Sequence, residues 1–71
     1  MERKIEKVFG DNIRCLREKH GLSREEMSKR VGISESDLSE LEGGTVSPHI
    51  MLDMLFTIEK EFGEKAYKLF I

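Results

Sequence analysis

The sequence predicts an all-α fold, a compact bundle of about five short helices that contains a helix-turn-helix. Apolar residues recur at steps of three and four, as they do along one face of a helix. Six glycines and one proline divide the 71 residues into short segments. Serines stand where several of these segments begin, which is the position of a helix N-cap. No alternation of apolar and polar residues indicates a strand, so no sheet is expected.

The first helix is expected from about Arg3 to His20. Gly10 lowers the helix propensity of its middle by up to about 1 kcal/mol relative to alanine, so a break or a frayed turn there is an open alternative. Cys15 is expected to act as a small hydrophobe beside the core. The apolar face of this helix comprises Ile5, Val8, Phe9, Ile13 and Leu16.

Two short helices follow, and each begins at a serine. Ser23 and Glu26 have the spacing of a capping box, and this helix is expected to end before Gly32. Ser34 begins the next helix, which ends at the glycine pair of residues 43–44. The tight turn of residues 31–33 contains a glycine and predicts a large angle between the two helices, which is the geometry of a helix-turn-helix.

A fourth helix and a short tail complete the chain. The pair Ser47–Pro48 combines a good N-cap with the residue favoured at the first helical position, and Gly63 ends or kinks this helix. The tail of residues 63–71 is expected to hold a short fifth helix. Its apolar residues either pack on the chain's own helices or form the seam of a homodimer; they are Tyr67, Leu69, Phe70 and Ile71.

Length and composition restrict the class of protein. Residues 1–71 are expected to form a single domain of marginal stability, which a partner subunit would help. The formal net charge of −2 argues against a generic basic DNA-coating protein. One cysteine forms no internal disulfide and fits a reducing cytoplasm. No signal peptide or membrane span is evident, so no membrane partner is expected.

No catalytic or metal-binding set is evident in the sequence. The two histidines and the single cysteine lack the spacing of zinc ligands. No nucleophile is paired with a base, and no phosphate-binding loop occurs. An enzyme is therefore not expected, nor is a cofactor or a metal.

The segment of residues 22–44 is the informative motif. The runs IRCLREKHGLS (13–23), EEMSKRVGIS (25–34) and LSELEGG (38–44), together with Pro48, resemble the phage-repressor and Cro-like (XRE) helix-turn-helix family. The resemblance covers about Phe9 to Phe62. It implies a lambda-repressor-like fold and a sequence-specific DNA-binding transcription regulator, expected as a homodimer on double-stranded DNA.

The resemblance also implies roles for individual residues. Arg17 and Glu42 would form a largely buried ion pair. Arg24 stands at the start of the second helix, where the family usually has a glutamine that contacts a phosphate, and the cap Ser23 beside it is a further candidate for a phosphate contact. Arg14 and Lys29 are among the other basic residues that could cradle phosphates, as are Lys4, Lys7, Lys19, Arg30 and Arg3. The positions that meet base edges would be Ser34, Glu35, Ser36, Ser39 and Glu40.

The third helix departs from the family's charge pattern. Residues 34–44 hold four acids and no base, and the loop of residues 45–47 that follows is also free of bases. One unscreened repulsion at about 4 Å is worth roughly 4 kcal/mol at an effective dielectric constant near 20. Glu35 or Glu40 could instead accept a hydrogen bond from a cytosine amino group. The alternative hypothesis is a protein-binding module that keeps the fold and binds a basic partner protein instead of DNA.

Overall fold

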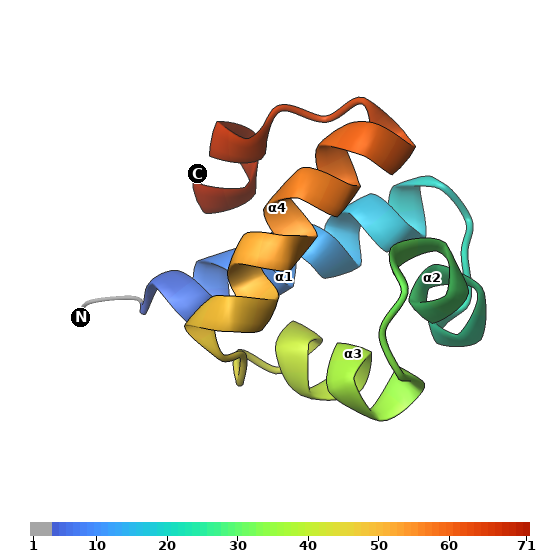
Figure 1. Ribbon diagram of the computed structural model, residues 1–71, viewed down its shortest axis with the longest axis horizontal. Coiled ribbons are helices and arrows are strands. Elements are labelled where there is room, and N and C mark those ends of the chain that lie inside the picture. Colours follow the sequence, from blue (N-terminus) through green and yellow to red (C-terminus); the bar gives the residue numbers. More distant parts are fainter. Residues whose placement is uncertain (1–3) are drawn as a thin grey trace.

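The computed structural model describes residues 4–71. Four α-helices follow one another along the chain: α1 (Ile5–Lys19), α2 (Arg24–Val31), α3 (Glu35–Glu42) and α4 (Pro48–Phe62) (Figure 1). They are followed by a 3-10 helix, η1 (Ala66–Phe70). The all-α class is confirmed for this part of the chain, which has no strand. The expected count of about five helices is slightly too high, because the tail forms a 3-10 helix in place of a fifth α-helix. Arg3 lies outside the described residues.

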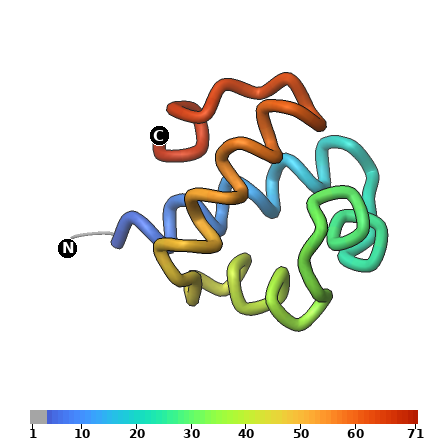
Figure 2. Tube along the Cα trace, in the orientation of Figure 1, coloured from blue at the N-terminus to red at the C-terminus, as the bar shows by residue number. Residues whose placement is uncertain are grey.

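All five elements contribute to one core. Helix α1 packs against α3 and η1, whereas α2 packs against α3 and α4, and α4 also packs against η1. In the view of Figure 2, the trace of α4 passes in front of α1, and α2 and α3 lie to one side of this crossing. No described helix combines the length and the apolar character needed to cross a bilayer. The buried apolar side chains are Phe9, Ile13, Leu16, Met27, Val31, Leu38, Leu41, Met54, Ile58 and Leu69.

Serine caps fix the starts of three helices, as the sequence predicts. The side chain of Ser23 accepts a hydrogen bond from the backbone N–H of Glu26, Ser34 caps α3 in the same way, and Ser47 caps α4. Each cap satisfies one of the backbone donors that a helix N-terminus leaves without a partner. Gly32 ends α2 with a φ of 74°, a left-handed conformation that favours glycine.

The tail packs onto the chain's own first helix. Leu69 is buried, and the ring of Phe70 stacks on that of Phe9 with 5.5 Å between the centroids. The side-chain amide of Asn12 donates hydrogen bonds to the carbonyl oxygens of Leu69 at 2.8 Å and Ile71 at 3.1 Å. Two of the four apolar tail residues are therefore used inside the domain.

Two expectations for α1 are wrong. Cys15 is exposed instead of lying beside the core. It follows the buried Ile13 by two positions, which on a helix of 3.6 residues per turn points it to the opposite side. Ile5 continues the apolar spacing but is 57% exposed, because the described core begins one turn later at Phe9.

Gly10 allows α1 to approach the end of α3 closely. The helix runs through Gly10 without a break, so the alternative of a frayed turn is wrong. A Cβ atom at this position would overlap the carbonyl oxygen of Leu41 and lie 3.3 Å from that of Glu42. The glycine therefore costs helix propensity but permits a contact between two backbones.

We expect Gly10→Ala to destabilise the domain, although alanine is the better helix former by about 1 kcal/mol. The added methyl group forces α1 and α3 apart, and overpacking of this kind costs about 1–3 kcal/mol. Thermal unfolding followed by circular dichroism measures the difference. The control is Gly43→Ala, where the nearest atom to the new Cβ is 3.4 Å away. A melting temperature of Gly10→Ala at or above that of the wild type would contradict this account.

Candidate nucleic-acid interface

The outer surface of α3 gathers the residues expected to meet base edges. Leu38 and Leu41 are buried and hold one side of this helix against the core. The other side therefore faces solvent, and all five of the predicted residues are exposed there: Ser34, Glu35, Ser36, Ser39 and Glu40. Asp37 is also exposed and lies in the first turn, where the helix dipole favours an acid.

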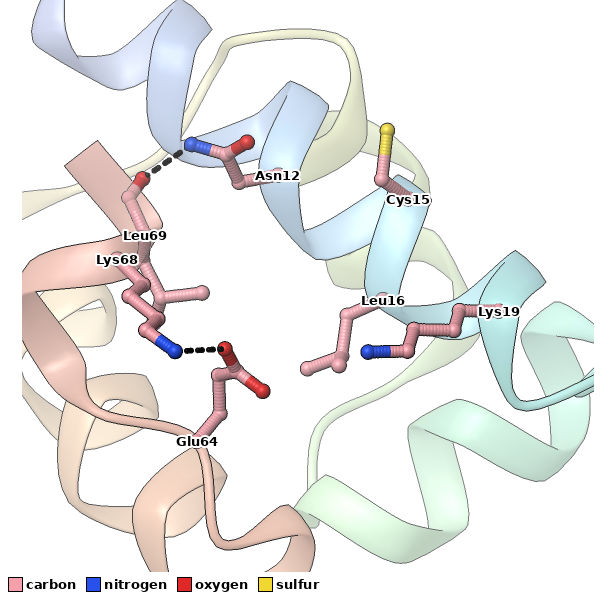
Figure 3. A pocket seen from close by; sticks show the side chains of 7 residues that line it. All are labelled: Asn12, Cys15, Leu16, Lys19, Glu64, Lys68 and Leu69. Atoms are coloured by element: carbon pink, nitrogen blue, oxygen red, sulfur yellow. Dashed lines mark hydrogen bonds and ion pairs between the residues drawn. The ribbon is translucent and has the colours of Figure 1, made fainter. Parts of the chain in front are cut away.

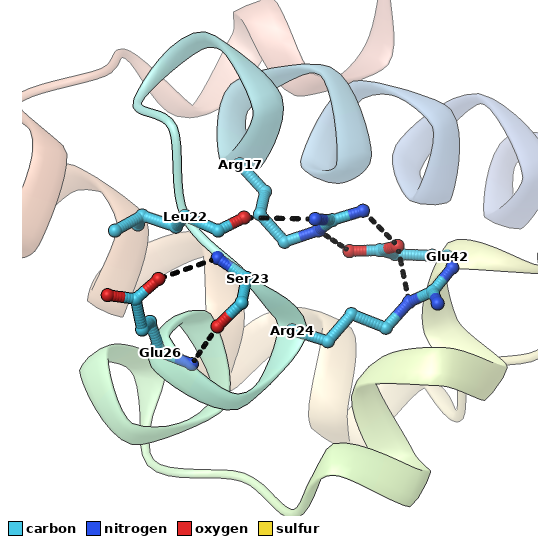
Figure 4. Close-up of polar contacts among 6 residues, drawn as sticks. All are labelled: Arg17, Leu22, Ser23, Arg24, Glu26 and Glu42. Carbon is cyan, nitrogen blue, oxygen red and sulfur yellow. Dashed lines mark hydrogen bonds and ion pairs between the residues drawn. The ribbon is translucent and has the colours of Figure 1, made fainter.

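A buried carboxylate fixes α3 to α1. The Oε2 atom of Glu42, at the end of α3, accepts a hydrogen bond from Nε of Arg17 at 2.8 Å, and its Oε1 atom lies 3.3 Å from Nη2 of the same guanidinium (Figure 4). The Glu42 side chain is 2% exposed. Arg17 also donates to the carbonyl oxygen of Leu22 at 3.0 Å, which ties in the start of the turn before α2. The structure thus forms the ion pair that the resemblance implies.

The bond to Glu42 also changes the acidity of Arg17. The hydrogen bond from its guanidinium to the carboxylate raises the pKa of Arg17 above its ordinary value, against the opposing effect of burial. The carboxylate of Glu42 thus favours the charged form of this arginine. Both oxygen atoms of the carboxylate accept hydrogen bonds from this arginine. The pair therefore has the bidentate geometry that carboxylates and guanidinium groups favour.

Arg24 brings α2 to the same carboxylate. Its Nε atom lies 3.2 Å from Oε1 of Glu42, so one carboxylate accepts hydrogen bonds from two arginines. The Arg24 side chain is half exposed, in contrast to that of Arg17. The predicted phosphate contact of Arg24 stays a prediction, but the structure gives this residue a second role in joining α2 to α3.

Ser23 and Glu26 form a complete capping box at the start of α2. The backbone N–H of Ser23 donates to Oε1 of Glu26 at 2.8 Å, and the backbone N–H of Glu26 donates to Oγ of Ser23 at 3.1 Å. These bonds stabilise the ionised carboxyl and lower the pKa of Glu26 below its ordinary value. The hydroxyl hydrogen of Ser23 is not used by the cap and can donate to a phosphate.

Three further cations fall into two groups. Arg14 on α1 and Lys29 on α2 are exposed, and their predicted phosphate contacts stay predictions. Arg30 is engaged within the domain: it donates to the carbonyl oxygen of Glu61 at 3.1 Å, and its guanidinium lies 4.6 Å from the centroid of the Phe62 ring. Arg30 thus joins α2 to α4 and is a weaker candidate for a phosphate contact.

The tertiary structure places Lys7 beside the loop that follows α3. A Cβ atom on Gly44 would lie 3.1 Å from Cδ of Lys7, so the lysine stem packs along the backbone of this base-free loop. The ammonium group of Lys7 forms an exposed ion pair with Asp11 at 3.0 Å. The sequence includes Lys7 among its basic residues but gives no sign of this neighbour, because the two residues lie far apart in the chain.

A small pocket between α1 and the tail is a poor candidate for a ligand site. Its volume is about 160 Å³, below the roughly 300–1,000 Å³ of small-molecule sites. Leu16 and Leu69 line it together with Asn12, Glu64 and two lysines, and Cys15 stands at its edge (Figure 3). Among residues 4–71, no group of three or more histidine, cysteine, aspartate or glutamate side chains could hold a metal ion.

Comparison with known proteins identifies one family. Residues 10–70 match the family described as a helix-turn-helix domain, which covers most of the chain. No curated protein and no solved structure gave a significant match. The matched region includes α2, the turn, α3 and the Arg17–Glu42 pair.

We expect Glu42→Gln to unfold or strongly destabilise the domain. Breaking a buried ion pair by neutralising one partner costs about 3–5 kcal/mol, because the other charge stays buried without compensation. Urea denaturation followed by circular dichroism measures the loss. Glu40→Gln is the matched control, since Glu40 is exposed two residues earlier on the same helix. The structural role of the pair would be refuted by equal urea midpoints for the two variants.

Proposed function

The chain belongs to this helix-turn-helix domain family, and from that premise we propose that it is a sequence-specific DNA-binding transcription regulator of the XRE, Cro-like type. The observation that carries the proposal is the arrangement of α2 and α3. Helix α3 is fixed to α1 and α2 by one buried carboxylate, while its opposite side is exposed along its whole length. A helix presented in this way can enter a major groove.

The side chains of α3 suit a restricted set of bases. The carboxylates of Glu35 and Glu40 accept hydrogen bonds but do not donate them. In the major groove, the base groups that donate are the amino groups of cytosine and adenine. The carboxylate of a glutamate is a known partner of the cytosine amino group. The serines of this helix can donate or accept. We therefore propose an operator with cytosine at the positions opposite the two glutamates.

Phosphate contacts must come from elements other than α3. Ser23 and Arg24 lie at the start of α2, and Lys7 lies against the loop after α3. These groups flank the acidic helix, and Arg14 and Lys29 add exposed charge on α1 and α2. Phosphate contacts supply most of the sequence-independent affinity for DNA. We therefore expect these cations to offset the repulsion between the acids of α3 and the DNA phosphates.

We further propose that the regulator acts in the cytoplasm as a homodimer on a two-fold operator. The half-sites would lie about one helical turn apart, roughly 34–36 Å. A single small domain makes few base contacts. Two copies of the chain on one DNA site double the number of these contacts. The marginal stability expected of a chain of this length also favours a second subunit.

One observation favours a second function. Glu35, Asp37 and Glu40 are exposed, and neither α3 nor the loop after it carries a base. Such a surface has the charge to bind a basic partner protein, with the helix-turn-helix serving as a scaffold. We keep this protein-binding module as the alternative, because the acids that weaken DNA binding would strengthen it.

We expect the wild-type domain to shift duplex DNA, either from its own upstream region or from a selected random library. Affinity should fall steeply as salt rises, because phosphate contacts release counterions. Fluorescence anisotropy across a salt series measures the slope. The double variant Glu35→Lys/Glu40→Lys separates the two functions: under the proposal it loses operator selectivity and keeps any co-purifying protein. Absence of any shift at about 50 mM salt by the folded wild type contradicts the proposal.

We expect Lys7→Gln to lower the salt slope of DNA binding by about one for each subunit bound, because each subunit loses one phosphate contact. Base preference should stay unchanged, since a phosphate contact carries no sequence information. Lys65→Gln is the control, as this exposed lysine precedes η1 in the tail. Equal slopes for both variants would remove Lys7 from the interface and leave DNA binding itself intact.

A further inference from the structure

The outer face of α4 carries two large apolar side chains that the described residues leave more than half exposed. Leu52 is 54% exposed and Phe56 is 71% exposed. They lie four residues apart, so they are neighbours on one face of the helix. Apolar residues that are exposed singly are ordinary, whereas adjacent ones contribute to the contiguous apolar patches at which proteins make contacts.

A groove lies directly beside Phe56. It has a volume of about 370 Å³, and it runs between α4 and the turn that joins α2 to α3. Phe56 forms part of its wall and also projects into solvent. The surface therefore offers a protruding ring and a hollow next to each other. Its lining residues are Val31, Gly32, Ile33, Asp53, Met54, Phe56 and Thr57.

The tail is a poorer candidate for the seam of a dimer. Leu69 is buried, the Phe70 ring stacks on Phe9, and Asn12 holds the backbone of the last residues. Only Tyr67 and Ile71 of the tail's apolar group stay largely exposed. Leu69 and Phe70 of the tail already pack inside the domain, whereas Leu52 and Phe56 on α4 remain exposed.

We propose that the occupant of this groove is a second copy of the chain. In a two-fold dimer the two α4 helices lie antiparallel, and Phe56 of each copy enters the groove of the other. Because the protruding Phe56 ring and the groove lie on the same surface, this surface can pair with a copy of itself. An isologous interface requires such self-complementarity. This inference rests on the homodimer put forward under Proposed function and assigns its interface.

Charge complementarity supports the antiparallel arrangement. Asp53 and Lys60 lie seven residues apart, which is about two helical turns and places them on the same face. Reversing α4 about a two-fold axis near residues 56–57 puts Asp53 of each copy opposite Lys60 of the other. Within the described chain the carboxylate of Asp53 has the exposed contact to His49 at 3.6 Å, and Lys60 is exposed without an ion-pair partner among residues 4–71.

The other acids of α4 are engaged within their own domain. Glu61 forms an ion pair with Arg30 at 3.7 Å, and Glu59 accepts a hydrogen bond from the backbone N–H of Ala66 at 3.3 Å. Asp53 and Lys60 are thus the charged groups of this face that remain for a partner. They would form two equivalent ion pairs at the rim of a central contact made by Phe56.

The test is the oligomeric state of the full chain, measured by sedimentation equilibrium over a series of protein concentrations. We expect Phe56→Glu to raise the dissociation constant of the dimer at least tenfold while circular dichroism and melting temperature show a folded domain. Ile71→Asp is the matched control, since Ile71 is the most exposed apolar residue of the tail. It should leave the constant unchanged.

Charge exchange tests the register. Asp53→Lys and Lys60→Asp should each weaken the dimer, because each places like charges opposite one another. The double variant Asp53→Lys/Lys60→Asp restores both pairs and should recover most of the affinity. A tail interface predicts no such recovery, since the two residues then never meet.

Each of three outcomes would overturn the inference: a wild type that is monomeric at every concentration, a Phe56→Glu variant that dimerises like the wild type, or dissociation caused by Ile71→Asp alone. The anisotropy assay with duplex DNA is run separately on the wild type. A monomer that still binds DNA refutes the homodimer and its interface but leaves DNA binding intact, whereas a dimer that binds no DNA refutes the regulator and leaves the interface intact.

Discussion

The carboxylate of Glu42 joins three helices at one point. It is almost fully buried at the end of α3, and it accepts hydrogen bonds from Arg17 of α1 and Arg24 of α2. A buried charge is costly unless it is compensated, and Arg17, which contacts both oxygens of Glu42, supplies most of this compensation. The angle of α3 against the rest of the domain therefore depends on this contact, and so does the surface that α3 presents.

That surface is acidic, and its electrostatics depend on what surrounds it. Glu35, Asp37 and Glu40 remain exposed, whereas Glu42 is neutralised inside the domain. Lys7 lies beside the backbone of Gly44, just after α3, and the loop that follows contains no basic residue. The balance between repulsion by the acids and attraction by these flanking cations decides whether a polyanion or a basic protein is the better partner.

Much of the fold could be predicted because its causes are local. The serines at positions 23, 34 and 47 cap the helices that the sequence assigned to them, and Gly32 and Gly63 end two of those helices. The pairing of Arg17 with Glu42 followed from the family resemblance. Predictions that depend on distant residues were less successful. Ile5 and Cys15 are exposed, and Gly10 allows close packing of α1 on α3, although a break or frayed turn of the helix was the alternative expected there.

The sequence by itself determined the helices, their caps and the position of the helix-turn-helix, because hydrogen bonds and apolar spacing act within a few residues. Apart from the pair of Arg17 and Glu42, only the tertiary structure decided which distant residues meet. It brought Arg24 to Glu42, Lys7 to Gly44 and the tail to α1, and it left Leu52 and Phe56 uncovered. The acids of α3 are visible in the sequence, but the cations beside them come from other helices. Their effect therefore depends on contacts between residues far apart in the chain.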